Sequence, residues 1–410
     1  MRATNGWGFL LFSLAVFSAA LLRAYFADAL PIGVLAAFSY FFFLAALVFS
    51  ARFGRLNIFY ALLFAWAIGA LLTSDLSADD VNRDQADLLR LAAWYLIPIN
   101  FAVFAWLEER SFLSVHSLVR AVLIVSQMGA VLFIADSLYL DTARSALTYE
   151  LFNAPDFLSP IPQTSLLFVA FAAISLGAKI ITKTQKTLEI AFLFALIGSL
   201  FALFVYPDAI GQFVFLLSSS LIVSAGFMHL AYSLAYYDEL TGVLGRRALN
   251  EGMAKLSGRY AIAMIDIDHF KRFNDEHGHN VGDQALKMIA AKLALIRGGG
   301  IVYRYGGEEF CVIFGGKDKR EAQQYLEETR KAIEDSPFVK RSPSRPKKTA
   351  KTHNRVRRSE VAYETIPITI SIGVADSDSG LNQNETLRAA DRALYRAKEN
   401  GRNRVVLQGK

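Results

Sequence analysis

Residues 304–310 read Arg304-Tyr305-Gly306-Gly307-Glu308-Glu309-Phe310. The runs on either side, residues 301–305 and 310–314, are rich in β-branched and aromatic side chains, which predicts a β-hairpin with the two glycines in its turn. Glycine tolerates positive φ and, because it has no Cβ, lets a phosphate approach the backbone closely. The two glutamates would then project from a rigid tip.

A second pair of carboxylates lies upstream. The apolar run of residues 260–265 ends in Asp266-Ile267-Asp268, which indicates a buried strand that delivers carboxylates at its C-terminal end. Carboxylates that converge from two elements suit Mg²⁺, which prefers oxygen ligands and is completed by water and substrate phosphates. Taken alone, the turn of residues 306–309 is better explained as an acidic, solvated loop, so the remaining motifs decide.

Five blocks occur in order between residues 238 and 404. They are DELTGVLGRR (238–247), DIDHFKRFNDEHGHNVGD (266–283), GGEEF (306–310), TISIGVA (369–375) and ADRALYRAKENGRNR (390–404). Together they closely resemble the GGDEF family of diguanylate cyclases. The resemblance covers residues 238–407 and says nothing about the first half of the chain.

The resemblance implies a metal site for Mg²⁺ or Mn²⁺. Its ligands would be Asp266, the backbone carbonyl of Ile267, and the turn carboxylates Glu308 and Glu309. Glu308 is also the expected general base, and Glu309 an additional ligand or charge partner. A helix N-cap before Phe270 is the alternative role for Asp266, but Asp268 is the better candidate for that cap.

The same resemblance assigns the GTP contacts. Guanine would be recognised by Asn274 and Asp283, with His279 nearby, because a carboxylate accepts from the N1–H and N2–H₂ groups of guanine. A solvent-exposed helical role is the alternative for Asn274 and His279. The triphosphate would be met by the backbone at Gly306 and Gly307 and by three cations, of which the first is counted with the catalytic residues. These cations are Lys271, Lys398 and Arg402.

The implied reaction condenses two GTP molecules into cyclic di-GMP and pyrophosphate. Each domain of this family holds one GTP, so activity is expected to require a homodimer. The alternative is a catalytically silent receptor or scaffold that keeps the fold and binds nucleotide or a partner. The intact acids of the turn favour the enzyme.

The C-terminal half is expected to be an α/β layer structure. We predict strands at 260–265, 301–305, 310–315, 366–375 and 403–407, and helices at 268–277, 281–296, 318–335 and 385–399. This order fits the antiparallel-rich, palm-like sheet of the resembled family, which is similar to that of nucleotide cyclases. The single cysteine, Cys311, falls in a predicted buried strand, where a reduced structural thiol is expected.

The first half predicts an all-α polytopic membrane domain. The chain is 54% hydrophobic, and long apolar runs cover residues 1–228. Eight candidate spans lie near 7–22, 32–49, 58–72, 89–106, 118–135, 165–181, 188–205 and 210–229. Several approach the roughly 20 residues that a bilayer crossing needs. We therefore expect a membrane domain at 1–229, a short linker at 230–237 that continues the last span as one helix, and a catalytic domain at 238–410.

Basic residues predict the orientation. One side carries Arg2, Arg52, Arg55, Arg110, Lys179, Lys183 and Lys186, and the other carries Arg23, Arg83 and Arg144. The excess marks the first side as cytoplasmic, which places both termini in the cytosol and the protein in the inner membrane. Cleavage of the first span as a secretory signal is the less favoured alternative.

Two stretches depart from the family pattern. Many relatives carry an Arg-x-x-Asp product-binding site, whereas this chain has Arg297-Gly298-Gly299-Gly300, so weak or no product inhibition is expected there. Residues 340–358 hold nine Lys or Arg and no acid, which predicts a disordered, solvated loop. Contact of this loop with the anionic membrane surface is the alternative. Nucleic-acid binding is not expected.

Overall fold

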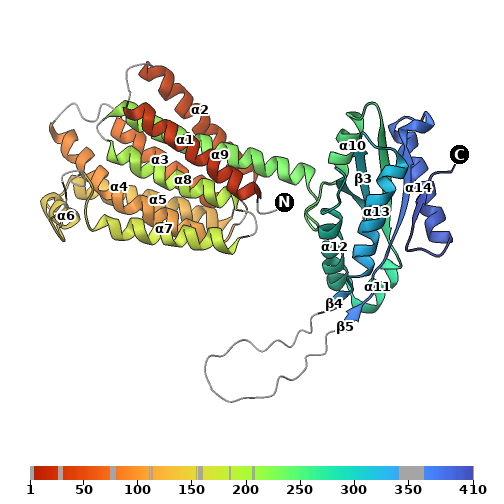
Figure 1. Ribbon diagram of the computed structural model, residues 1–410. Helices are drawn as coiled ribbons and strands as arrows, with labels where there is room; N and C mark the ends of the chain where they lie inside the picture. Colours follow the sequence, from red (N-terminus) through yellow and green to blue (C-terminus); the bar gives the residue numbers. More distant parts are fainter. Residues whose placement is uncertain are drawn as a thin grey trace, which may run out of the picture. The chain divides into compact units, whose positions relative to one another are not determined.

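The structure, a computed structural model, describes residues 4–25, 31–73, 80–109, 111, 114–153, 155, 160–183, 186–205, 208–340 and 364–409. The chain divides into two compact units, Met1–Ala231 and Tyr232–Lys410, and each is described by itself (Figure 1). The basic stretch predicted at 340–358 lies outside the described residues except for Lys340, as do Arg2 and Arg110 of the predicted cytoplasmic side.

The first unit is helical. Its helices are α1 (Thr4–Tyr25), α2 (Ile32–Arg52), α3 (Leu56–Thr73), α4 (Asp80–Trp106), α5 (Val115–Ala135), α6 (Leu140–Leu147), α7 (Ser165–Thr182), α8 (Thr187–Phe204) and α9 (Ala209–Tyr236). Within the described residues, six helices are long and apolar enough to cross a membrane: α2, α4, α5, α7, α8 and α9. Helices α1 and α3 hold the shorter apolar stretches Gly8–Ala20 and Leu56–Leu72, so the count of eight spans stays a prediction.

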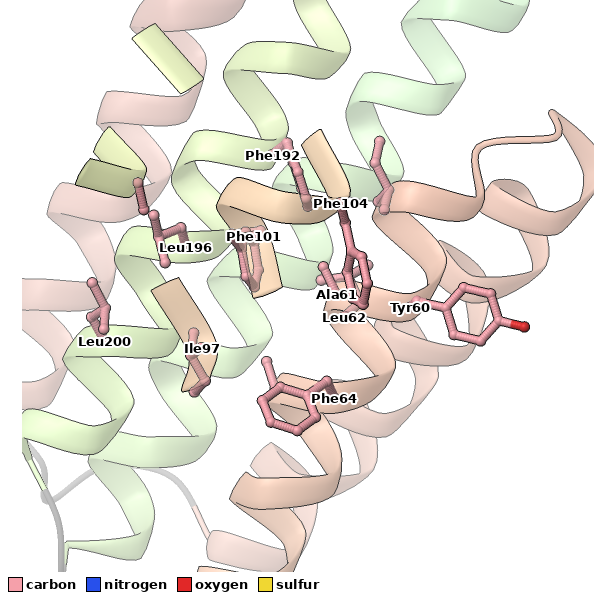
Figure 2. Packing of buried hydrophobic residues seen from close by; sticks show 14 of the residues in the cluster. Tyr60, Ala61, Leu62, Phe64, Ile97, Phe101, Phe104, Phe192, Leu196 and Leu200 are labelled. Carbon is pink, nitrogen blue, oxygen red and sulfur yellow. The ribbon is translucent and has the colours of Figure 1, made fainter. Parts of the chain in front are cut away.

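Burial separates central from peripheral helices in this unit. The apolar windows of α4, α8 and α9 are 72%, 67% and 67% buried, whereas those of α2, α5 and α7 are 17%, 22% and 17% buried. Figure 2 shows the centre, where Phe101 of α4 stacks on Phe192 of α8 with ring centroids 4.7 Å apart. Helices that turn apolar side chains outward are the kind that face lipid.

Close packing and serine hydroxyls hold α9. A Cβ on Gly198 of α8 would lie 1.9 Å from Oγ of Ser219, so the two helices approach here with only a hydrogen between them. Nε1 of Trp66 donates to Oγ of Ser220 at 3.0 Å, and Oγ of Ser39 donates to the carbonyl of Phe213 at 2.9 Å. Helix α9 continues without a break to Tyr236, as the sequence predicted for the linker.

The second unit is an α/β structure. Its elements are α10 (Arg246–Ala254), β1 (Tyr260–Ile267), α11 (Phe270–His277), α12 (His279–Leu293), β2 (Ile301–Gly306), β3 (Glu309–Gly315), α13 (Lys319–Glu334), β4 (Phe338–Lys340), β5 (Glu364–Ile366), β6 (Ile370–Asp376), a 3₁₀ turn (Ser377–Ser379), α14 (Gln383–Glu399) and β7 (Val405–Leu407). The main sheet has the order β2-β3-β1-β6-β7. All its pairs are antiparallel except β6 with β7, which confirms the predicted antiparallel-rich sheet.

Helices cover both faces of this sheet, and β1 is buried throughout. Alternate residues of β1 pack in opposite directions because side chains alternate along a strand. Ala263 and Ile265 join the core under α11, α12 and α13, whereas Ile262 and Met264 join the core under α10 and α14. By the same alternation Asp266 belongs to the α14 face. Cys311 is buried in β3 on that face, as predicted, and burial raises the pKa of its thiol.

One predicted element is wrong, and two features of the fold were not predicted. The strand expected at 366–375 is interrupted: β5 ends at Ile366 and β6 begins at Ile370. Pro367 has no N–H to donate to a ladder, and the carbonyl of Thr369 accepts from the backbone N–H of Asp268 instead. Helix α10 and the two-stranded sheet of β4 with β5 were not predicted.

Candidate active site

Strand β1 and the β2–β3 hairpin bring carboxylates to the same end of the sheet. In the ladder, Asp266 of β1 lies opposite Glu309 of β3 and opposite Ser371 of β6. Asp266 is only 6% exposed, and its Oδ2 lies 2.9 Å from Nζ of Lys398 near the end of α14. Helix α14 can approach β6 this closely because a Cβ on Gly373 would lie 2.0 Å from the backbone N of Leu394.

The predicted hairpin is present, with its turn shifted by one residue. Gly306 pairs with Glu309, so Gly306 ends β2 and the tip consists of Gly307 and Glu308. Gly307 has φ 49°, in the left-handed region that glycine adopts without steric cost. Glu308 therefore stands at the tip, and Glu309 is the first residue of β3.

Arg304 and Asp238 fix this tip, and neither was assigned a role from the sequence. Nε and Nη2 of Arg304 donate to the carbonyl of Gly307 at 3.0 and 2.6 Å, while Nη1 donates to Oδ1 of Asp238 at 2.8 Å. The same Oδ1 accepts from the backbone N–H and the hydroxyl of Thr241. Asp238 begins the first motif block and Arg304 begins the stretch of residues 304–310, and these placements were the available signal.

The carboxylates of the site disfavour one another's ionisation. Burial, followed by repulsion from Asp266, raises the pKa of Glu308 and of Glu309. Burial also raises the pKa of Asp266, against the hydrogen bond and charge of Lys398, which lower it. The charge of Arg402 acts in the same lowering direction on Asp266. The cluster is thus an anionic site that a cation would stabilise.

The donor set suits a hard divalent cation. Carboxylate oxygens are the ligands that Mg²⁺ and Mn²⁺ prefer. The described residues contain no ready-made group of three or more His, Cys, Asp or Glu side chains in a metal-binding arrangement, and Lys398 is the cation that contacts Asp266. The chemistry of the residues fits a metal, while the ligand set predicted from the resemblance, including the carbonyl of Ile267 at the end of β1, stays a proposal.

Asp268 does not cap α11, so that prediction is wrong. The N-cap position of α11 is His269, at φ 57°, and it makes no side-chain capping bond. The carboxylate of Asp268 instead accepts from the hydroxyls of Thr369 and Ser371, both at 2.7 Å, and from the backbone N–H of Asn403 at 3.1 Å. Asp268 therefore connects β1 to β6 and to the loop that follows α14.

The residues predicted to recognise guanine lie on α11 and α12, which are joined at Gly278. Asn274 is half-buried on α11, and its Oδ1 is buried without a hydrogen-bond partner. A Cβ on Gly282 would lie 1.8 Å from this oxygen, so the side chain occupies space that only a glycine leaves. A buried acceptor without a partner is a place where a ligand donor can bind. The alternative of an exposed helical role is therefore wrong for Asn274.

The remaining predicted contacts are solvent-exposed. His279 and Asp283 are exposed in the first turns of α12, and Lys271 is exposed on α11. The sequence did not reveal the role of Gly282, because a glycine inside a helical pattern carries no chemistry of its own.

Two of the cations predicted to contact the triphosphate, Lys398 and Arg402, lie at the end of α14 and in the loop after it. Three consecutive residues of this loop have positive φ: Gly401 at 102°, Arg402 at 62° and Asn403 at 45°. Lys398 contacts Asp266 directly, and Arg402 is close enough for its charge to act on the same carboxyl. Positive charge thus borders the acidic cluster on the α14 side.

Comparison with known proteins gives matches over this second unit. Residues 235–353 and 340–404 match the family described as diguanylate cyclase, GGDEF domain. The chain is similar to diguanylate cyclase VdcA of Vibrio cholerae, with 39% identity over 42% of this chain and 47% of that protein. It is also similar to the probable diguanylate cyclase DgcT of Escherichia coli, with 35% identity over 43% of this chain and 36% of that protein.

Among solved structures, the coiled coil and GGDEF domain of DgcB from Caulobacter crescentus, in complex with c-di-GMP, aligns with a TM-score of 0.38 and 28% identity. That alignment covers 44% of this chain and 89% of the other. The chain spans about half the length, or less, of these two curated relatives.

Proposed function

The second unit of this chain is a GGDEF domain of the diguanylate cyclase family, and we propose that the protein is a membrane-bound diguanylate cyclase. It would condense two GTP molecules into cyclic di-GMP and release pyrophosphate. The proposed division is a membrane domain at 1–229, a helical linker at 230–237 and the GGDEF domain at 238–410.

One observation carries this proposal: Asp266, Glu308 and Glu309 converge from β1 and the β2–β3 hairpin. Burial raises the pKa of all three, and repulsion from Asp266 further raises the pKa of Glu308 and Glu309. Burying several carboxylates close together lowers the stability of the fold unless a bound cation offsets their repulsion. Nucleotidyl transfer needs such a cluster.

Mg²⁺ or Mn²⁺ would be held by the carboxylates of Asp266, Glu308 and Glu309 and the carbonyl of Ile267. When bound, the ion supplies Lewis-acid stabilisation of charge on the reacting phosphate.

The protein residues supply positioning and proton transfer. Lys398 and Arg402 meet the triphosphate with positive charge, together with Lys271 and the backbone at Gly306 and Gly307. Glu308, at the tip of the hairpin, accepts the proton of the attacking 3′-hydroxyl as the general base. The new bond joins 3′-oxygen to α-phosphorus, and pyrophosphate leaves with the electrons of the broken bond.

A second transfer closes the ring. Since one domain holds one GTP and the two nucleotides attack each other, two GGDEF domains must face each other in a homodimer. This arrangement explains why a rigid hairpin tip matters, because Glu308 must meet a hydroxyl that the other domain presents.

Guanine selection follows from Asn274, Asp283 and the neighbouring His279. The unpartnered Oδ1 of Asn274 accepts a donor of the base, and the exposed carboxylate of Asp283 accepts from the N1–H and N2–H₂ groups. Adenine presents an acceptor at N1, so ATP would leave these acceptors without partners.

The six apolar helices of the first unit support a location in the inner membrane with the GGDEF domain in the cytosol. GTP is available there. Because α9 continues to Tyr236 and the motif blocks begin at Asp238, we propose that the membrane domain itself regulates the cyclase through this helix.

The experiment uses full-length protein in lipid nanodiscs with Mg²⁺ and either GTP or ATP, and products are identified by chromatography and mass spectrometry. The proposal expects cyclic di-GMP from GTP and no cyclic product from ATP. Tight binding of GTP with no product, in nanodiscs that hold two copies, would overturn the enzyme in favour of a silent receptor.

A further inference from the structure

The loop after α14 contains strained backbone at a functional residue. Arg402 and Asn403 adopt φ values of 62° and 45°, in the left-handed region that side chains other than glycine rarely occupy. Such residues persist only where surrounding structure imposes the conformation, and they cluster at ligand-binding sites. Arg402 is one of the proposed triphosphate contacts, so what imposes its conformation matters for binding.

The backbone bonds of the loop are only part of the restraint. The N–H of Arg402 donates to the carbonyl of Ala397 at 3.0 Å, a bond that closes the C-terminal end of α14. The N–H of Asn403 donates to the carboxylate of Asp268. Arg402 and Asn403 are consecutive residues with positive φ. If Asn403 were not held, the loop could relax to ordinary φ values and the side chain of Arg402 would change direction.

The side chain of Asn403 provides that hold through α13. Its Oδ1 accepts from Nη1 of Arg330 at 2.6 Å, and its Nδ2 donates to Oε1 of Glu334 at 2.7 Å. Both functional groups of the amide are therefore used, which fixes its orientation.

Arg330 is itself rigidly placed. It is 7% exposed, although it lies on a helix whose charged residues are otherwise solvated. Glu327 accepts from its Nε at 2.9 Å, and Glu334 accepts from its Nη1 at 2.7 Å. A planar guanidinium held by two carboxylates has a fixed direction, so its bond to Asn403 acts as a firm tether.

We propose that Arg330 and Asn403 are positioning residues: they hold the loop of residues 401–403 in its left-handed conformation and thereby aim the guanidinium of Arg402 at the triphosphate of GTP. This inference rests on the proposed function, because it concerns the same nucleotide site. Neither residue needs to touch substrate.

The test is a double-mutant cycle in the full-length protein. Asn403→Gly removes the tether but keeps a residue that tolerates positive φ, so the loop can still form. It is combined with Arg402→Ala in the double mutant. Arg330→Lys is measured alongside, alone and with Arg402→Ala, because lysine keeps the positive charge but lacks the planar guanidinium that bonds several partners at once. Binding of the α,β-methylene analogue of GTP is measured together with kcat, KM and Tm.

The expected result is that Asn403→Gly weakens analogue binding and raises KM by about tenfold, the order of one charge-assisted hydrogen bond, with a smaller change in kcat. In the Arg402→Ala background the same change has little further effect, because the residue being positioned is gone. Arg330→Lys is expected to follow the same pattern with a smaller shift.

Glu328→Gln is the matched control, since Glu328 also lies on α13 and forms an exposed ion pair with Arg297 at 2.7 Å, away from Asn403. It should leave analogue binding unchanged. Equal losses from Asn403→Gly with and without Arg402 would overturn the inference, as would unchanged binding. Analogue binding needs no turnover, so a protein that binds but makes no product disproves the proposed enzyme while the cycle still decides the positioning role.

Discussion

Gly282 decides where the side chain of Asn274 lies. The amide oxygen occupies the space that a Cβ on Gly282 would fill, at 1.8 Å, and it is buried without a partner. In the proposed function, guanine recognition would therefore depend on a residue that itself makes no contact with the base. The sequence supplied Asn274 through the family motif, but this dependence on the neighbouring helix is visible only in the fold.

We expect Gly282→Ala to raise KM for GTP by about tenfold, because the displaced amide loses its hydrogen bond to the base. Displacing the half-buried amide costs stability, and the preference of alanine over glycine in a helix interior, about 1 kcal/mol, offsets that cost. Steady-state kinetics and thermal unfolding measure the two effects separately. Gln284→Ala, at an exposed position of the same helix, is the control. A normal KM for Gly282→Ala would show that Asn274 is not a substrate contact.

Arg297 is engaged in a way that bears on product inhibition. Its Nη2 lies 2.7 Å from Oε2 of Glu328, and the Asp of the resembled product-binding motif is replaced by Gly300. We predict that cyclic di-GMP inhibits the enzyme weakly or not at all through this site. Inhibition constants for wild type and Arg297→Ala should be alike. Submicromolar inhibition that disappears in Arg297→Ala would contradict this expectation.

At the scale of elements, the hairpin tip is held by the segment of residues 238–245, which precedes α10. Arg304 joins the carbonyl of Gly307 to Asp238, which begins the first motif block. Burial raises the pKa of Asp238, but hydrogen bonds from Thr241 and Arg304 outweigh it and hold the pKa below its ordinary value. The folded pKa is thus depressed, so this stabilisation is present above the ordinary pKa and is lost as the pH falls through the folded value.

Arg304→Met is therefore expected to lower kcat by about tenfold at neutral pH, because the tip that carries Glu308 loses its support. Asp238→Asn should lower kcat as well, but by a smaller factor. In a double-mutant cycle the two changes should be non-additive, since the pair lies in contact. Fully additive effects of the two substitutions on kcat would show that residues 238–245 and the hairpin tip act independently.

Helix α9 is the element that links the proposed sensor to the cyclase, and its last turn is fixed at Tyr236, whose hydroxyl donates to Glu251 at 2.7 Å. Each residue inserted after Ala231 would rotate the following part of α9 by about 100° about the helix axis, relative to the part before it. We expect cyclase activity to change with one to three inserted residues and to recover with seven, which is about two turns. Activity that is indifferent to insertion length would contradict regulation through α9.

The elements show where reading the sequence succeeds and where it stops. Strands β1, β2 and β3 were predicted closely, because apolar runs bounded by glycines and acids define them. Asp268 was misassigned since its partners, Thr369 and Ser371, are about a hundred residues away in sequence. The break at Pro367 was missed because the apolar pattern continues across it.

At the scale of the whole molecule, composition alone separated an apolar half from a motif-bearing half, and the structure has two compact units at Met1–Ala231 and Tyr232–Lys410. The candidate catalytic residues were proposed from short motifs, whereas Arg304, Arg330 and Asn403 make tertiary contacts with the elements that carry them. The motifs contain Asn403, but no local pattern shows which distant residue it bonds.

The most direct test of the central claim compares Glu308→Ala with wild type in nanodiscs supplied with GTP and Mg²⁺, with Glu328→Ala as an exposed acidic control. Cyclic di-GMP is quantified by chromatography and mass spectrometry. We predict product from wild type and from Glu328→Ala, and a loss of at least about a hundredfold in Glu308→Ala, the scale typical of a general base. Cyclic di-GMP formation by Glu308→Ala at the wild-type rate would contradict the assignment of the acidic cluster as the catalytic centre.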